Sequence, residues 1–253
     1  NLGLEVLGTR ADGYHLLRTG MQSISLADEL LLTRTAEEGI TLRCDEPSLP
    51  TDGRNLAVRA AEAVFRHCGL SGGVRIELKK QIPAEAGLGG GSADAAAVLR
   101  GLRALFSLPL GDEALRELAL PLGADVPFCV GGGTMLAEGI GEVLSPLPPM
   151  PPCHLVIVKP PCGSSTKAVY AALSLKALRP WEQPDARLLE NALRGQNVTL
   201  LGASLQNALE KPATELQPVL LDYRQFLTES GAAGAAMSGS GSAFFAVFPE
   251  AER

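Results

Sequence analysis

The chain has 253 residues, of which 46% are hydrophobic and 20% charged, so it is not a disordered protein and can bury a core in one large or two modest domains. The net charge of -6 argues against broad nucleic-acid binding, although it does not exclude one small phosphate pocket. No apolar run approaches the roughly 20 residues of a membrane span. The five cysteines contain no CxxC pair, which is typical of free thiols in a reducing compartment. We therefore expect a cytoplasmic protein without membrane or nucleic-acid partners.

The first part of the chain mixes predicted strands with predicted helices. Alternating apolar residues indicate strands over residues 1–7, two short strands within 22–34 around a turn at Asp28, and further strands over 40–44 and 73–78. Asn55 is expected to cap a helix that ends near Cys68, because Gly69 follows it. Further helices are predicted from about Ser92, as its N-cap, to Phe106, and from about 112 to 120.

A proline-rich stretch, "PLPPMPP" over 146–152, marks the predicted domain boundary, since five prolines in seven residues fit neither a helix nor a central strand. It divides the chain into an N-terminal domain, 1–150, and a C-terminal domain, 151–253. A strand over 154–160 comes next, then helices up to a stop at Gly231, then strands over 233–237 and 243–248 on either side of "SGSGS". Because strands and helices do not alternate regularly, the pattern favours an α+β fold in two domains.

The stretch "PAEAGLGGGSADAAA" over 83–97 combines a loose backbone with strong helix formers. Glycines let a ligand approach the backbone closely, and a helix that begins there presents free N–H groups and a partial positive charge. This arrangement predicts a phosphate-binding loop. The run does not match the GxGxxG or Walker A patterns, and the HRD and DFG signatures of protein kinases are absent.

The pattern P-x-x-x-G-L-G-G-G-S-[AS]-D-A-A closely resembles the central motif of the GHMP kinases, a family of small-molecule kinases. "GAAMSGSGSAFFAVF" over 234–248 resembles the family's C-terminal glycine motif. "DGYH" over 12–15 and "LGADVPF" over 122–128 are similar to motifs of the branch that phosphorylates 4-diphosphocytidyl-2-C-methyl-D-erythritol. The resemblance extends from Asn1 to Phe248.

This resemblance implies the two-domain GHMP kinase fold, with an N-terminal domain like ribosomal protein S5 domain 2 and a ferredoxin-like C-terminal domain. It implies transfer of the γ-phosphoryl of ATP, as its Mg complex, to the 2-hydroxyl of this cytidyl diphosphate sugar alcohol, in the non-mevalonate route to isoprenoid precursors. Two alternatives stay open: another GHMP kinase, of the homoserine or mevalonate type, and a non-catalytic nucleotide-binding protein of the same fold.

The resemblance also assigns roles to residues. Asp125 matches the catalytic aspartate, and the substrate-binding positions are Asn1, Tyr14, His15 and Tyr170. Tyr14 and Tyr170 are expected to flank the cytosine. The predicted ATP-binding residues are Asn55, Lys80, Pro83, Ala84, Glu85, Ala86, Gly87, Leu88, Gly89, Gly90, Gly91, Ser92, Ala93, Ser240 and Gly241. No acidic residue in a matched motif is an obvious metal ligand.

Two of these residues also have a purely structural interpretation. Asn55 can serve only as a helix cap, and Lys80 can be a solvated residue at the end of a strand. The family's motif pairs the catalytic aspartate with a lysine that would precede Asn1, so we expect the natural chain to extend upstream. We also expect the C-terminal domain to be truncated here.

Overall fold

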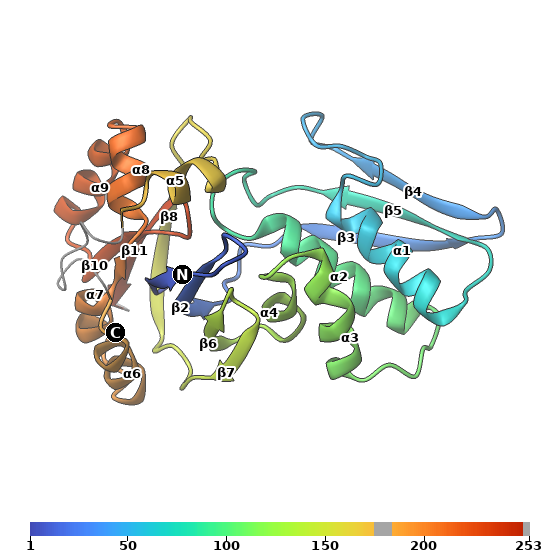
Figure 1. The fold of residues 1–253 in the computed structure, drawn as a ribbon, viewed down its shortest axis with the longest axis horizontal. Coiled ribbons are helices and arrows are strands. Elements are labelled where there is room, and N and C mark those ends of the chain that lie inside the picture. The colour runs from blue at the N-terminus through green and yellow to red at the C-terminus, as the bar shows by residue number, and fades with distance from the viewer. Residues whose placement is uncertain (175–183, 250–253) are drawn as a thin grey trace. The chain divides into compact units, whose positions relative to one another are not determined.

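The computed structural model describes residues 1–174 and 184–249, and the chain divides into two compact units (Figure 1). Three segments form the first unit: Asn1–Gln22, Glu85–Leu88 and the chain from Gly133 onward. The second unit consists of Ser23–Ala84 and Gly89–Gly132. The boundary predicted at residue 150 concerns family domains and stays a prediction; it falls inside the first compact unit, because strands before and after the proline-rich stretch both belong there.

One sheet of the first unit has the order β7-β6-β2-β1-β9. Its strands are β1 (Gly3–Thr9), β2 (His15–Gln22), β6 (Thr134–Gly139), β7 (Val143–Pro146) and β9 (Gln206–Asn207). The pairs are antiparallel except for β1 with β9, which run parallel. The short parallel strand β9 thereby joins residues that lie about two hundred positions apart in the chain, since Leu4 pairs with Asn207.

The second sheet of this unit is antiparallel, with the order β10-β11-β8. Its strands are β8 (Cys153–Val158), β10 (Gly234–Met237) and β11 (Phe244–Pro249). Helices of the unit are α5 (Thr166–Ala172), α6 (Ala186–Arg194), α7 (Val198–Ser204), α8 (Glu210–Leu216) and α9 (Leu220–Glu229).

The middle strand β11 is apolar on both faces because both are covered. Phe244 and Ala246 pack in one cluster with Leu220 and Leu227, which belong to α9. The alternate residues Phe245 and Val247 pack in a second cluster that includes side chains of α6 and α7. A strand buried on both faces reads as a continuous apolar run, which is what "FFAVF" is.

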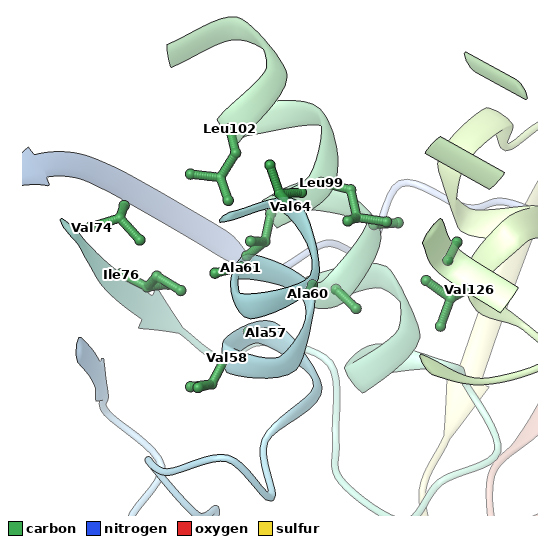
Figure 2. Close-up of a cluster of buried hydrophobic side chains, with 14 of the residues drawn as sticks. Ala57, Val58, Ala60, Ala61, Val64, Val74, Ile76, Leu99, Leu102 and Val126 are labelled. Carbon is green, nitrogen blue, oxygen red and sulfur yellow. The ribbon is translucent and has the colours of Figure 1, made fainter. Parts of the chain in front are cut away.

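The second unit packs helices on a three-stranded sheet of order β3-β5-β4. The strands are β3 (Glu29–Thr35), β4 (Gly39–Cys44) and β5 (Gly73–Lys79); the helices are α1 (Leu56–Cys68), α2 (Gly90–Leu105), α3 (Asp112–Ala119), the short 3-10 helix η1 (Leu120–Leu122) and α4 (Val126–Gly131). Figure 2 shows α1 side chains such as Ala61 and Val64 among Val74 and Ile76 of β5 and Leu99 of α2. Small alanines on α1 and α2 let these two helices pack closely.

The structure confirms several of the predicted helices and strands, together with the residues at which they begin and end. Asn55 caps α1 by accepting a hydrogen bond from the Ala57 backbone N–H, and Gly69 ends the helix in the left-handed conformation. The predicted strands over 40–44, 73–78, 154–160, 233–237 and 243–248 match β4, β5, β8, β10 and β11 within two residues at each end.

Three predictions were wrong or incomplete. The first of the two strands expected within 22–34 lies upstream as β2, because the chain leaves the sheet of the first unit after Gln22. Ser92 does not cap α2, which begins at Gly90 after Gly89. The short elements α4, β6 and β7 were not predicted, since runs of four to six residues are too short to show a clear periodicity.

The five cysteines are all free, as predicted, and all are half-buried. Within residues 1–174 and 184–249, no helix has both the length and the apolar character needed to cross a membrane.

Candidate functional site

The start of α2 is a helix N-terminus that no side chain caps. Gly89 precedes it with φ +69°, a conformation that favours glycine, and an added Cβ there would meet open space. Ala93 N–H donates to the Gly89 carbonyl as the first intrahelical bond. The N–H groups of the three residues before Ala93 therefore lack intrahelical acceptors, which is the arrangement that binds anions.

Individual glycines of the run serve different purposes. Gly90 packs within its own unit, because an added Cβ would lie 3.0 Å from Ile82 Cγ2 and 3.4 Å from Lys80 Nζ. Gly91 is exposed, and a Cβ there would make only an ordinary 3.6 Å contact with Leu56. Gly91 is thus the residue of the helix's first turn at which a methyl group tests ligand approach without disturbing the core.

The segment Glu85–Leu88, which precedes Gly89 in the chain, belongs to the first unit and contacts the C-terminal glycine motif there. Ser238 Oγ donates to the Gly87 carbonyl at 2.8 Å, and Ala243 N–H donates to the Ala86 carbonyl at 3.0 Å. Gly87 has φ +71°, and an added Cβ would overlap the Ser238 carbonyl oxygen. The two glycine-rich stretches therefore meet backbone to backbone, and Gly87 serves that contact.

Ser240, in the C-terminal glycine motif, is held by two hydroxyl groups, one from the segment before α5 and one from the first residue of α5. Its carbonyl accepts from Ser164 Oγ at 2.6 Å, and its own Oγ lies 2.8 Å from Thr166 Oγ1. The next residue, Gly241, has φ +84°. Asn207 supports the same motif, since its Nδ2 donates to the carbonyls of Met237 and Gly239 at 2.9 and 2.7 Å.

Lys80 is neither a solvated strand end nor free. Its side chain is 9% exposed, and its Nζ forms ion pairs with Asp28 and, at 2.8 Å, with Asp94. Both carboxylates are also nearly inaccessible, at 2% and 4%. Asp28 Oδ1 accepts in addition from the backbone N–H groups of Gln81 and Ile82, at 2.5 and 2.8 Å.

The two carboxylates of this cluster differ in their pKa. Burial raises the pKa of Asp94 to about 6 even though Lys80 draws it down, and Asp94 Oδ1 has no hydrogen-bond partner. Burial acts on Asp28 too, but hydrogen bonds from Lys80 and from two backbone N–H groups outweigh it and lower its pKa. Burial opposes the charge of Lys80, yet the two carboxylates raise its pKa overall. Near pH 7 the cluster therefore holds Lys80 and Asp28 as ions.

Both polar atoms of the Asn55 side-chain amide form hydrogen bonds within their own unit. Its Oδ1 caps α1 at Ala57, and its Nδ2 donates to the Pro50 carbonyl at 2.8 Å. This geometry supports the helix-cap interpretation; a contact with ATP stays a prediction, as does that of Lys80.

Asp125 occupies the N-cap position of α4 without acting as a cap. The residue is exposed, its backbone is helical (φ -84°, ψ -14°), and its side chain accepts no capping hydrogen bond. Pro127 follows at the start of α4, a position that suits proline because the helix's first N–H groups are unpaired in any case. Asp125 lies in the turn before α4, where a purely structural turn aspartate would also lie, so its catalytic role stays a prediction.

The aromatic residues predicted to bind the substrate lie in the first unit. The ring centroids of His15, at the start of β2, and Tyr170, on α5, are 4.8 Å apart, with planes inclined by 31°. A base stacked on both rings would need roughly 7 Å between them, so no base fits between this pair. Tyr14 is 62% exposed, and a sandwich would need its ring as the opposite face.

Asn1 lies beside the C-terminal glycine motif of the same unit. Its Nδ2 donates to Thr19 Oγ1 at 2.9 Å, and an added Cβ on Gly239 would lie 3.3 Å from its Oδ1. Pro83 is half-buried and Ala84 exposed. The predicted residues thus fall in both units: Asn1, Tyr14, His15, Glu85, Ala86, Gly87, Leu88, Tyr170, Ser240 and Gly241 in the first, and the others in the second.

Residue patterns did not point to Asp28, Asp94 or Asn207. Asp28 was read as a turn residue and Asp94 only as a letter of the glycine motif. The sequence does offer one signal for the two aspartates. Asp28 stands next to an apolar strand and Asp94 stands inside an alanine-rich helix, and an aspartate in such surroundings is rarely buried unless it is paired.

The predicted Mg complex of ATP raises the question of whether the described part of the chain offers ligands for a metal ion. The described residues contain no group of three or more His, Cys, Asp or Glu side chains that could hold a metal ion. Mg²⁺ commonly keeps several waters and binds through substrate phosphates with one or two carboxylates. We therefore assign no protein ligand to it.

Comparison with known proteins identifies the family of the chain. The family model "GHMP kinases N terminal domain" matches residues 55–133, and "GHMP kinases C terminal" matches residues 184–253. Together they span more than half of the chain. The chain therefore belongs to the GHMP kinase family and is a small-molecule kinase with the two-domain GHMP fold, as the resemblance implied.

Similar proteins narrow the class further. A 4-diphosphocytidyl-2-C-methyl-D-erythritol kinase from Carboxydothermus hydrogenoformans is 45% identical over 247 residues, 98% of this chain and 85% of that protein. The corresponding enzyme of Acetivibrio thermocellus is 42% identical over 248 residues, 98% of this chain and 87% of that protein. A crystal structure of 4-(cytidine 5'-diphospho)-2C-methyl-D-erythritol kinase is 41% identical, covers 98% of this chain and 86% of its own, and superposes with a TM-score of 0.81.

Proposed function

We propose that the chain transfers the γ-phosphoryl of ATP to the 2-hydroxyl of 4-diphosphocytidyl-2-C-methyl-D-erythritol, in the non-mevalonate route to isoprenoid precursors. The observation that carries the proposal is the uncapped start of α2 after a glycine-rich stretch, in a chain that is over 40% identical to enzymes of this name along nearly its whole length. ATP enters as its Mg complex, and the product is the 2-phosphate of the substrate.

The phosphates of ATP bind at the start of α2. The unpaired N–H groups of Gly90, Gly91 and Ser92 donate to phosphate oxygens, and the helix's partial positive charge favours the anion. A donor set of backbone N–H groups does not depend on net charge, which explains how an acidic protein can bind ATP. Lys80, which is almost fully buried next to Gly90, contributes to ATP binding through its positive charge and through the position in which it holds this turn.

Asp125 prepares the acceptor hydroxyl. Phosphoryl transfer consists mostly of positioning and charge stabilisation, so the carboxylate orients the hydroxyl for in-line attack and accepts its proton. An exposed carboxylate that caps no helix N–H group has its oxygens available for that task.

Tyr14, His15 and Tyr170 recognise the cytosine. The base stacks against an aromatic face, and the imidazole of His15 hydrogen-bonds its polar edge. Asn1 contacts the acceptor end of the substrate. A cytoplasmic location stays a prediction, with which the five free thiols agree.

A substrate panel tests the proposal. The gene's full-length product is assayed with ATP and one acceptor at a time: 4-diphosphocytidyl-2-C-methyl-D-erythritol, homoserine or mevalonate, with ADP release as the readout. We expect turnover with the cytidyl compound and at least a hundredfold lower kcat/KM with the others. A preference for homoserine or mevalonate would establish the first alternative, and ATP binding without turnover of any acceptor would establish the second.

A further inference from the structure

We propose that Asp28 is a positioning residue for ATP, which holds the two ends of the glycine-rich stretch at a fixed spacing through Lys80. Asp28 lies outside every motif that the family resemblance singled out. The proposal rests on the assignment of the ATP phosphates to the start of α2.

Asp28 binds the three residues that directly precede the glycine-rich stretch. Its carboxylate pairs with the Lys80 ammonium and accepts the backbone N–H groups of Gln81 and Ile82. Three successive residues directly before Pro83 are therefore fixed to one side chain. Asp28 itself precedes β3, whose first residue Glu29 pairs with Lys79 at the end of β5, so the sheet holds the carboxylate in register.

Lys80 connects Asp28 to the part of the chain that follows the glycine-rich stretch. Its Nζ also binds Asp94, in the second turn of α2. The first residue of α2, Gly90, packs closely against Lys80 and Ile82. A Cβ added to Gly90 would lie 3.4 Å from Lys80 Nζ and 3.0 Å from Ile82 Cγ2. A cation between two buried carboxylates, one before and one after the stretch, thus sets how far apart its ends lie.

Neutralising Asp28 should therefore loosen the stretch without removing any group that faces a phosphate. Asp28→Asn keeps Oδ1 as acceptor for the two backbone N–H groups but withdraws the charge that holds Lys80. We expect the KM for ATP to rise at least fivefold while the KM for the cytidyl substrate stays within twofold, in steady-state assays of the full-length enzyme. A general loss of structure would instead change both KM values or reduce the active fraction.

Glu29→Gln is the matched control. It removes the neighbouring ion pair between Glu29 and Lys79, which is 3.4 Å long and about two-thirds exposed. A solvated pair of this kind contributes little, so we expect both KM values to stay within twofold of wild type.

A second variant covers the case in which Asp28→Asn does not fold. Asp94→Asn keeps an acceptor for Lys80 while withdrawing one charge, and we expect the KM for ATP to rise at least twofold. Equal changes in both KM values, or a lower melting temperature with an unchanged KM for ATP, would overturn the proposal.

Gly91→Ala in the same assay separates this inference from the proposed function. If Gly91→Ala leaves the KM for ATP unchanged, the phosphate assignment fails and the inference fails with it. If Gly91→Ala raises that KM but Asp28→Asn does not, the inference alone is wrong.

Discussion

At the scale of single residues, the predicted site residues fall into two groups. Some have polar side chains that already bind neighbouring protein groups, and others have polar atoms that remain available to a ligand. Asn55 and Lys80 are occupied within their own unit, whereas Asp125 carries a carboxylate that caps nothing. The family resemblance assigned all three residues to the site, but only the folded chain shows which hydrogen bonds and ion pairs their polar atoms form.

Asp125→Asn tests the chemical role, since it keeps the shape and removes the charge. We expect kcat to fall by about 10²–10⁴, the usual span for loss of a general base, with both KM values nearly unchanged. The measurement is steady-state kinetics of the full-length enzyme. Asp112→Asn, an exposed aspartate at the start of α3 in the same unit, is the control. Turnover of Asp125→Asn within threefold of wild type would remove the catalytic assignment.

Tyr170→Ala tests the recognition role. Stacking of a base on an aromatic ring contributes on the order of 1–3 kcal/mol, so the KM for the cytidyl substrate should rise about five- to a hundredfold while that for ATP stays nearly constant. Tyr223→Ala is the matched control, because Tyr223 packs against the same apolar cluster. Similar effects of both variants on both substrates would mean that Tyr170 serves only the core.

At the scale of elements, the glycine-rich stretch illustrates what a pattern can and cannot predict. The helix after the glycines was predictable from its alanines. Its first residue was not, because Ser92 satisfies the usual cap preference while the fold leaves the helix uncapped at Gly89. The roles of Gly87 and Gly90, which serve backbone and side-chain packing, depend on neighbours distant in sequence.

Gly91→Ala tests whether the start of α2 receives phosphate. Alanine favours a helix over glycine by roughly 0.5–1 kcal/mol, and its methyl would make only an ordinary contact with Leu56, so the melting temperature should stay the same or rise. ATP affinity should nevertheless fall about tenfold, as calorimetric titration would show. Gly111→Ala, before α3, is the control, since a Cβ there meets open space as well. Unchanged ATP affinity in Gly91→Ala would rule out phosphate at this turn.

At the scale of the whole molecule, the two-part α+β architecture and family were predictable from motif order, but the composition of the compact units was not. The family pattern is linear in sequence. The units are assembled from separated segments, because β9 and the C-terminal glycine motif join elements from the first residues of the chain. No local periodicity carries that information.

The buried cluster should make stability depend on pH. With a pKa of about 6 in the folded chain against about 3.9 unfolded, Asp94 binds more protons when folded between about pH 4 and 6. The free energy of unfolding should therefore fall as the pH rises from 5 to 7.5, by on the order of 1–2 kcal/mol. The pKa of Asp28 is lowered instead, so its contribution is lost only in more acidic solution.

Calorimetric unfolding at several pH values measures this dependence. Asp94→Asn should reduce it, because the variant lacks the titrating group. Asp112→Asn should not, since the pKa of Asp112 is lowered and its titration lies below this window. A pH dependence that persists in Asp94→Asn would assign it to another group.

The division of the units along the chain also bears on how the protein is made. Ser23–Ala84 and Gly89–Gly132 leave the ribosome before most of the first unit, and these segments contain every strand, helix and core residue of the second unit. The first unit must wait, since β1 pairs with β9 only after residue 207 has been synthesised, and contacts between such distant residues form slowly. During translation, β1 therefore remains without its partner β9 while the second unit can already fold, and chaperones that bind unpaired strands would find their targets in this interval.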